Sequence, residues 1–442
     1  MKNFFKPINF LYFILISFII NSFILIRAFP LILVIIIPLF LFINIFAGTI
    51  KIKTKSSRLK ICNHGGIILS IFALSLIPSI IYQAILAIIT IPNNYLLFIY
   101  NLVFCVVTSA IIFWNGIICV YLTSIQMGIK WRIIGALCGM IPIVNLIVLR
   151  NIINLVIDEI DFELEKERIN NDDKSKEMCS TKYPILLVHG VFFRDFKHFN
   201  YWGRIPRTLE ARGAKIYYGE HQSALAIENS GRELAARIKF IVERTGCEKV
   251  NIIAHSKGGL DCRYAISEFG AGPYVASLTT INTPHRGCIF AEKLIDAAPE
   301  KLKNSVSKIY NTALKELGDE TPDFMAAVTD LTNKSCIKLN EKLTFPSDIY
   351  SQSIGSIMNV PRSGRFPLNL SYRYVKNFDG PNDGLVGEDS FKWGDNYILL
   401  QTDGKRGISH GDIIDLNREN INDFDVREFY ADLVNNLKNK GL

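Results

Sequence analysis

One short segment of the sequence has the residue types that a nucleophilic serine needs. Ser256 lies in the sequence Ala-His-Ser-Lys-Gly-Gly, between an apolar run at 250–253 and a helical pattern at 260–266. A sharp turn from strand to helix lifts a serine hydroxyl above a sheet edge, and it requires small residues two positions either side because the two backbones come close there. Ala254 and Gly258 fill those positions. Since the bare pattern is common by chance, it is the flanking elements that favour a nucleophile over a helix-capping serine.

A serine nucleophile needs a base, and the base needs a carboxylate that orients it. After a turn of this kind the partners follow in the order Ser, Asp, His. His285 precedes the suitable acids, so chain order selects His410 as the base. Asp383 is the expected carboxylate because it lies in a Gly- and Pro-rich turn after the apolar run 372–375, which we interpret as a strand. The competing acids, interpreted as surface residues, are Asp379, Asp389 and Asp395.

Acyl transfer also requires two N–H donors in place for the developing oxyanion. One is expected from the backbone of Lys257, and the other from that of Val191, which follows a His-Gly pair after the apolar run 185–188. His255, beside the serine, is interpreted as a packed neighbour. The sequence contains no P-loop, dinucleotide fingerprint or His/Cys metal cluster. The histidines to which we assign no role are His64, His198 and His221.

From residue 182 onward, short apolar runs alternate with amphipathic helical patterns. The runs are 185–188, 215–218, 249–253 and 275–281. Continuous apolar runs separated by helices are typical of a parallel sheet covered on both faces. We therefore predict an α/β domain over 182–442 with a doubly wound, mostly parallel sheet. A charged helix tail and linker over 151–181 precede it.

The first 150 residues differ in composition from the rest. They hold 11 Lys or Arg and no Asp or Glu, within a chain whose net charge is +8. Cationic residues between long apolar runs indicate membrane topology, and they exclude a nucleic-acid-binding protein. We predict an all-α transmembrane region over 1–150, with four spans and a fifth that is either a short span or an interfacial helix. The four runs are 8–26, 28–50, 66–91 and 95–125, with a hinge at 92–94, and the fifth is 133–149.

Basic residues between 51 and 60 and at 130–132 place the N-terminus and both clusters on the cytoplasmic side. A full span at 133–149, favoured on length, makes the α/β domain extracytoplasmic, whereas an interfacial helix leaves it cytoplasmic. The spans carry no acidic residue, which favours an anchor over a transporter. The chain has nine cysteines, an odd number without a CxxC pair, which indicates free thiols and mildly favours a reducing setting.

Several motifs of the α/β domain occur together in one order. They are Tyr183-Pro-Ile-Leu-Leu-Val-His-Gly190, Trp202-Gly-Arg-Ile-Pro206, Leu209-Glu-Ala-Arg-Gly-Ala214, Lys249-Val-Asn-Ile-Ile-Ala-His-Ser-Lys-Gly-Gly259, Asn282-Thr-Pro-His-Arg-Gly287 and Asn382-Asp-Gly-Leu-Val386 before His410. Over about 182–430 the chain resembles the bacterial triacylglycerol lipases of the α/β-hydrolase superfamily. The resemblance implies the triad Ser256, Asp383 and His410, with the Val191 and Lys257 amides as the oxyanion hole. It also implies a helical cap or lid at about 289–345 over an acyl pocket.

Two departures from the family pattern concern Ala254 and calcium. Ala254 replaces the usual first glycine of the serine motif. The family commonly binds a structural calcium near the catalytic histidine, and Asp412 matches one ligand position, but the acidic ligand upstream of Asp383 has no clear counterpart. The resemblance implies no required cofactor and leaves calcium open. It does not cover the membrane region.

The sequence therefore predicts a membrane-anchored serine hydrolase of carboxylic esters. A lipid or other long-chain ester is favoured because the anchor holds the pocket near a bilayer and the cap is apolar. One alternative is an acyltransferase that uses the same triad. A second is an inactive hydrolase fold that serves as a binding module on a membrane scaffold, and a third places the function in the spans.

Overall fold

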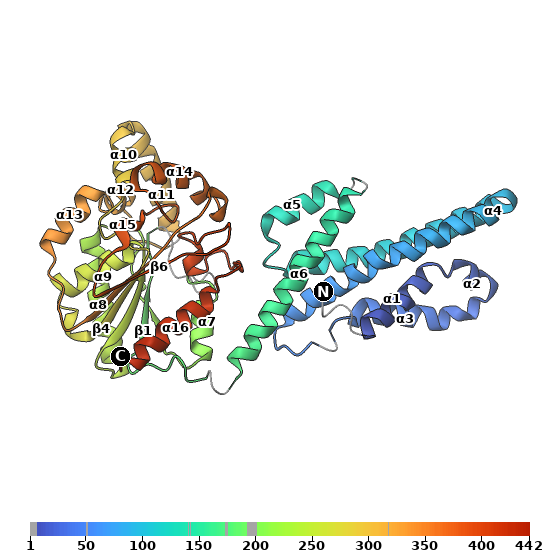
Figure 1. Ribbon diagram of the computed structural model, residues 1–442, viewed down its shortest axis with the longest axis horizontal. Coiled ribbons are helices and arrows are strands. Elements are labelled where there is room, and N and C mark those ends of the chain that lie inside the picture. The colour runs from blue at the N-terminus through green and yellow to red at the C-terminus, as the bar shows by residue number, and fades with distance from the viewer. Residues whose placement is uncertain are drawn as a thin grey trace. The chain divides into compact units, whose positions relative to one another are not determined.

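The chain folds into two compact units, residues 1–169 and 170–442 (Figure 1). The computed structural model describes residues 7–49, 52–139, 141, 143–172, 176–191, 201–316 and 318–442. The first unit is helical, and the second combines helices with one sheet.

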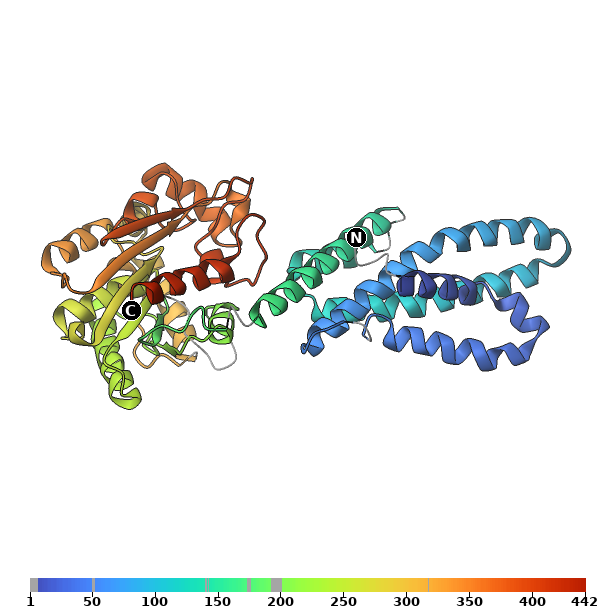
Figure 2. The same cartoon turned by 60° about the horizontal axis from the view of Figure 1, so that its bottom comes forward.

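The first unit is built around α4 (Ser57–Thr123), in which two helical segments join across a kink at Asn94. The two segments fold back on each other (Figure 2). Small residues allow them to approach closely, since a Cβ placed on Gly65 would lie 2.8 Å from the Cβ of Cys119. Among the described residues, α4 is the one helix long and apolar enough to cross a membrane. The predicted runs 66–91 and 95–125 lie in its two segments, and the predicted hinge contains the kink.

The first two predicted spans are not continuous helices. The run 8–26 is divided at Asn21 and Ser22, and the run 28–50 contains a 3-10 turn and a helix that ends at Phe46. A 14-residue helix is about 21 Å long, which is shorter than the roughly 30 Å hydrocarbon core. The prediction of spans at 8–26 and 28–50 is therefore not confirmed by this part of the structure. The shorter helices of the unit are α1 (Pro7–Ile20), α2 (Phe23–Ala28), η1 (Pro30–Ile32), α3 (Leu33–Phe46), α5 (Gly128–Cys138) and α6 (Val144–Asn170).

The segment 133–149 does not form one helix, because α5 ends and α6 begins within it. The Glu159 carboxylate of α6 pairs with Arg58 Nη1 at 2.6 Å, and it accepts a hydrogen bond from Ser124 Oγ at 2.6 Å. Arg58 lies in the first turn of α4 and Ser124 caps its last turn, so both mark the same end of the folded-back helix. The first and last turns of α4 thus lie at the same end of the folded-back helix, and α6 returns to that end. A full crossing by one helix at 133–149 is therefore not confirmed, and the extracytoplasmic placement that depended on it is not supported.

The second unit contains a six-stranded parallel sheet with the order β2-β1-β3-β4-β5-β6. Strands β1, β3 and β4 are buried along their whole length because helices cover both faces of the sheet. This arrangement is the predicted doubly wound parallel sheet, and it fits the α/β-hydrolase fold. The strands are β1 (Ile185–Val188), β2 (Ile216–Tyr218), β3 (Val250–His255), β4 (Val275–Ile281), β5 (Tyr350–Ser356) and β6 (Asn396–Leu400). One face packs on α7 (Ile205–Ala211) and α16 (Val426–Asn439), and the other on α8 (Ile227–Thr245) and α9 (Lys257–Glu268).

The segment expected to form a cap, 289–345, is helical and gathers at one end of the sheet (Figure 1). Apolar side chains on it are exposed, among them Leu294, Leu302 and Ile309. The run 372–375, interpreted as a strand, lies in a helix instead, so that interpretation is wrong. The helices of this region are α10 (Ile289–Ala297), α11 (Glu300–Glu316), α12 (Phe324–Thr329), α13 (Asn333–Lys342), α14 (Leu368–Asp379) and α15 (Glu388–Phe391), and the 3-10 turns of the unit are η2 (Gly272–Tyr274), η3 (Pro361–Ser363) and η4 (Asp412–Ile414).

Candidate active site

Ser256 stands in the turn between β3 and α9 with an unusual backbone conformation. Its φ of +55° and ψ of −132° are values that side-chain-bearing residues rarely adopt. The space around the turn admits only small residues: a Cβ on Gly258 would overlap the carbonyl of His189, and one on Gly190 would lie 2.8 Å from the Cβ of Ser256. Tight packing of this kind sustains backbone strain at functional sites. The turn thus has the geometry that the motif predicts.

His410 and Asp383 lie together, as the chain order of the motifs predicts. The Nδ1 atom of His410 is 2.6 Å from Oδ2 of Asp383, whose side chain is fully buried. The carboxylate also accepts hydrogen bonds from the Asn282 amide at 2.7 Å and from the backbone N–H groups of Leu385 and Val386 at 2.9 and 2.8 Å. Because an ionised carboxylate only accepts, the proton of the imidazole lies on Nδ1 and leaves Nε2 free to act as a base.

The histidine approaches the serine turn from the loop after β6. The ring of His410 lies 4.5 Å, centroid to centroid, from the ring of His255, the residue before Ser256. Both Ser256 and His410 are described, and no hydrogen bond joins the Ser256 hydroxyl to the His410 ring in this structure. Catalytic hydrogen bonds of this type often tighten only when substrate is bound. The structure therefore brings Asp383 and His410 together and places His410 beside the turn that carries Ser256.

The two expected oxyanion donors flank Ser256. Lys257 begins α9, where the first backbone N–H groups of a helix have no partner within the helix. Val191 ends the described part of the loop after β1, directly after Gly190, whose backbone lies against the serine side chain. Residues 192–200 lie outside the described residues, and they include His198.

Two polar contacts beside the serine turn were not predicted. The Tyr201 hydroxyl lies 2.6 Å from Nδ1 of His255 and accepts a hydrogen bond from the Gly190 N–H at 3.1 Å. Behind the turn, the Lys257 ammonium pairs with the Asp261 carboxylate at 2.6 Å, and both side chains are buried. The i, i+4 spacing of Lys257 and Asp261 on the predicted helix is a signal that could have found this pair. Tyr201 carries no such local signal.

The remaining histidines have structural surroundings. Burial, with a contribution from His410, holds the pKa of His255 well below its ordinary range, which agrees with a packed neutral neighbour. His285 stacks on Trp393 with ring centroids 4.8 Å apart. His221 stacks on His189 at 4.0 Å.

The rejected acids have other partners. The Asp379 carboxylate accepts from the first two N–H groups of α10 at 3.0 and 2.9 Å, and it is half-buried, so its interpretation as a plain surface acid is wrong. Asp389 pairs with Lys392 at 3.2 Å, and Asp395 accepts from the Ser351 hydroxyl at 2.9 Å.

Comparison with known proteins points to one class of enzyme. A protein of Pseudarthrobacter phenanthrenivorans is 36% identical over 182 residues, which are 38% of this chain and 56% of that protein. Another, of Vibrio cholerae serotype O1, is 27% identical over 290 residues, which are 59% of this chain and 89% of that protein. Both relatives are triacylglycerol lipases. The similarity is thus to carboxylic ester hydrolases.

The chain spans about half the length of the Pseudarthrobacter relative and of a triacylglycerol lipase of Burkholderia plantarii, 56% and 49% respectively. No family model matches the chain. Among solved structures, the lipase of Staphylococcus hyicus aligns with 59% of this chain and 97% of its own, at 20% identity and a TM-score of 0.47.

Proposed function

We propose that the chain is a serine hydrolase of carboxylic esters in which Ser256, His410 and Asp383 act as the triad. The observation that carries the proposal is the buried contact of 2.6 Å between His410 Nδ1 and Asp383 Oδ2, in a loop that lies beside the strained Ser256 turn. The similarity to triacylglycerol lipases supports it independently.

In the proposed reaction, Ser256 Oγ attacks the ester carbonyl carbon while His410 Nε2 takes the hydroxyl proton. Asp383 holds the ring in the required tautomer and stabilises the imidazolium. The imidazolium then protonates the leaving alkoxide, which departs as the alcohol and leaves an acyl group on Ser256. Water, deprotonated by His410, attacks the acyl carbon, and the acid product leaves as the serine regains its proton. In both steps the Lys257 and Val191 N–H groups stabilise the oxyanion.

The substrate we favour is a lipid or another long-chain ester. The helices of 289–345 expose apolar side chains, including Leu302 and Ile309, at the end of the sheet that carries the site. Such exposed apolar side chains fit contact with an acyl chain or a lipid surface. The calcium raised by the resemblance is not part of this proposal.

We also infer that the helical unit anchors the protein in a membrane, with α4 crossing twice and turning at Asn94. The basic residues Arg58, Lys130 and Arg132 belong to the end of α4 to which α6 returns. By the positive-inside rule this end faces the cytoplasm, so the hydrolase unit lies on the cytoplasmic side. Protease digestion of intact cells leaves the hydrolase unit whole, and digestion of opened cells cleaves it. Cleavage in intact cells would contradict this topology.

The proposal is tested by serine-directed fluorophosphonate labelling and by turnover of p-nitrophenyl esters of increasing chain length. In the full-length protein, Ser256→Ala abolishes labelling and lowers kcat by at least about 10³-fold. The matched control is Ser180→Ala, at a serine before β1 whose hydroxyl donates to the Glu177 carbonyl, which leaves both unchanged. Labelling that persists in Ser256→Ala would refute the nucleophile, and the absence of turnover on every ester would refute the hydrolase.

A further inference from the structure

The carboxylate of Asp412 bonds back to Ser409 and so bridges the backbone on the two sides of His410. Its Oδ2 atom accepts hydrogen bonds from the backbone N–H of Ser409 at 3.0 Å and from the Ser409 hydroxyl at 2.7 Å. In the other direction, the backbone N–H of Asp412 donates to the Ser409 carbonyl at 3.0 Å. These contacts form a tight ring around His410. The orientation of Asp412 therefore sets the path of the backbone on both sides of the histidine.

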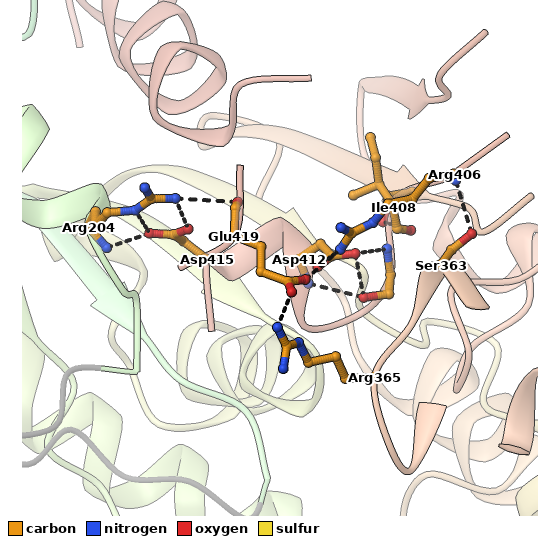
Figure 3. Close-up of polar contacts among 11 residues, drawn as sticks. Arg204, Ser363, Arg365, Arg406, Ile408, Asp412, Asp415 and Glu419 are labelled. Carbon is orange, nitrogen blue, oxygen red and sulfur yellow. Dashed lines mark hydrogen bonds and ion pairs between the residues drawn. The ribbon is translucent and has the colours of Figure 1, made fainter. Parts of the chain in front are cut away.

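Arg406 holds Asp412 from its other oxygen. The Nη2 atom of Arg406 lies 3.0 Å from Asp412 Oδ1 and 2.9 Å from Glu419 Oε2, and Arg365 pairs with the second oxygen of Glu419. Figure 3 shows the Arg406 guanidinium between the two carboxylates. One guanidinium thus joins a carboxylate just after His410 to another seven residues further along the chain.

The main chain beside Arg406 is itself fixed to the body of the unit. The backbone N–H of Gly407 donates to the Ser363 hydroxyl at 3.1 Å, and that of Ile408 donates to the Ile357 carbonyl at 2.8 Å. The Ile408 carbonyl accepts from the Ser356 hydroxyl at 3.2 Å, at the carboxyl end of β5. The guanidinium therefore extends from a backbone anchored on the sheet. The guanidinium therefore fixes the orientation of the Asp412 carboxylate, and Asp412 in turn fixes the backbone around His410.

The residues at this place do not fit the calcium ion that the resemblance implies. Calcium takes six to eight oxygen ligands. Here both oxygens of Asp412 are already engaged, one by Arg406 and one by Ser409. Within the described ranges, no group of three or more His, Cys, Asp or Glu residues could hold a metal ion. The positive charge beside Asp412 comes from a side chain.

We propose that Arg406 is a positioning residue for His410 and that the histidine loop is held by this guanidinium without a metal ion. The inference rests on the proposed function only in taking His410 as the base. Without Arg406, Asp412 loses its cationic partner, while the nearby Glu419 carboxylate, which still pairs with Arg365, repels it. The ring around His410 would then loosen, and the imidazole would spend less time aligned with Ser256. Misplacement of this kind lowers kcat and leaves substrate binding nearly unchanged.

The first arm of the test uses variants of the full-length protein in detergent. Arg406→Gln lowers kcat by about 10- to 100-fold with KM changed by less than about twofold. Arg406→Lys, which retains the charge, recovers a substantial part of kcat. The control is Arg373→Gln, at an exposed arginine of α14, which behaves as the wild type. A wild-type kcat in Arg406→Gln, or a lysine variant no better than the glutamine variant, would overturn the role of Arg406.

The second arm measures metal dependence with a readout that needs no activity. The thermal unfolding midpoint of the wild type stays unchanged after exhaustive treatment with EDTA and after addition of millimolar calcium chloride. The kcat of the wild type also stays unchanged under both treatments. A midpoint that falls with EDTA and returns with calcium would overturn the metal-free loop. The unfolding midpoint does not depend on turnover. If the protein has no esterase activity, the proposed function is refuted, but the midpoint still shows whether the His410 loop binds calcium.

Discussion

The serine side and the histidine side of the site are built in different ways. Ser256 is fixed by its own main chain, through a positive φ and through Gly190 and Gly258, which let three backbones meet. His410 lies in a loop whose shape depends on side-chain ion pairs, with Arg406 and Arg204 as the cationic partners. Packing of neighbouring backbones therefore fixes Ser256, and side-chain ion pairs hold the loop that carries His410. Substitutions on the two sides are expected to fail in different ways.

The largest expected effect is on the histidine side, for Asp383→Asn. An asparagine amide can donate to Nδ1 and so stabilise the wrong tautomer of His410, which lowers kcat by about 10⁴-fold. KM changes little, because the substitution acts on the orientation of His410 and not on substrate binding. Steady-state kinetics measure the effect, with far-UV circular dichroism to verify folding. Asp379→Asn is the control, since that carboxylate caps α10 and does not reach His410. A comparable loss of kcat in the control would undo the assignment of Asp383.

On the serine side, Asp261→Asn is expected to act on stability. Burial raises the pKa of Asp261 to about 7, and the attraction of Lys257 opposes this rise. The substitution leaves the buried Lys257 ammonium without its charged partner, which costs roughly 3–5 kcal/mol of the free energy of unfolding. Urea denaturation of the full-length protein measures the loss.

A matched control for this pair replaces both charges. The double variant Lys257→Met/Asp261→Leu keeps the backbone N–H of residue 257 and removes both buried charges, so its stability stays near that of the wild type. Equal destabilisation by the single and double variants would show that volume, and not charge, decides stability behind the serine turn.

The difference between the two sides also explains what the sequence could reveal. The strand, the serine and Gly258 lie within a few positions of one another, so they could be predicted from one motif, whereas Gly190 belongs to a separate motif earlier in the chain. His410 and Asp383 could be selected by chain order alone. On the histidine side, Arg204 lies 211 positions from its partner Asp415. Arg406 lies 6 positions from Asp412, but in an irregular loop whose spacing predicts no contact. No local pattern marks them, and the pairing became visible only in three dimensions.

The helical unit gives the same lesson about local signals. Hydropathy located the apolar runs and the hinge at Asn94, because length and composition are local properties. It did not predict the break at Asn21 and Ser22, where the Asn21 amide donates to Ser79 of α4. Nor did it predict that Glu159 returns to Arg58. Such contacts join distant segments, and local hydropathy does not register them.

A smaller effect is expected for Arg204→Gln on the histidine side. Arg204 pairs with the buried Asp415 at 2.8 Å through both Nε and Nη2, and its backbone N–H donates to the same carboxylate at 2.7 Å. Because that backbone donor remains, the loss of stability is about 2–3 kcal/mol, below that of a fully unpaired charge. Urea denaturation measures it, with Arg207→Gln, at an exposed arginine of α7, as the control. A loss no greater than the control's would mean that Asp415 does not depend on Arg204.

The smallest effect concerns acid sensitivity on the serine side, at His285. Its Nδ1 accepts from the Arg263 guanidinium at 3.1 Å, and its Nε2 lies 2.9 Å from the Thr280 hydroxyl. Burial, reinforced by Arg263 and Arg286, lowers the pKa of His285 well below its ordinary value. The unfolded chain takes up a proton near pH 6.5 that the folded protein excludes. Stability from this group is therefore complete above about pH 6.5 and falls as the pH drops below it.

Between about pH 6.5 and pH 5.5 the loss from His285 amounts to roughly 1 kcal/mol. Other groups also titrate in this range, so the measured quantity is the difference between wild type and His285→Gln in urea denaturation at the two pH values. Glutamine can still accept from Arg263 and does not titrate, so the variant loses about 1 kcal/mol less than the wild type on acidification. Identical losses in the two proteins would mean that the folded protein takes up the proton at His285 as readily as the unfolded chain does. Burial and the neighbouring guanidinium groups would then not control the protonation of His285, and acid sensitivity would not distinguish this side of the site.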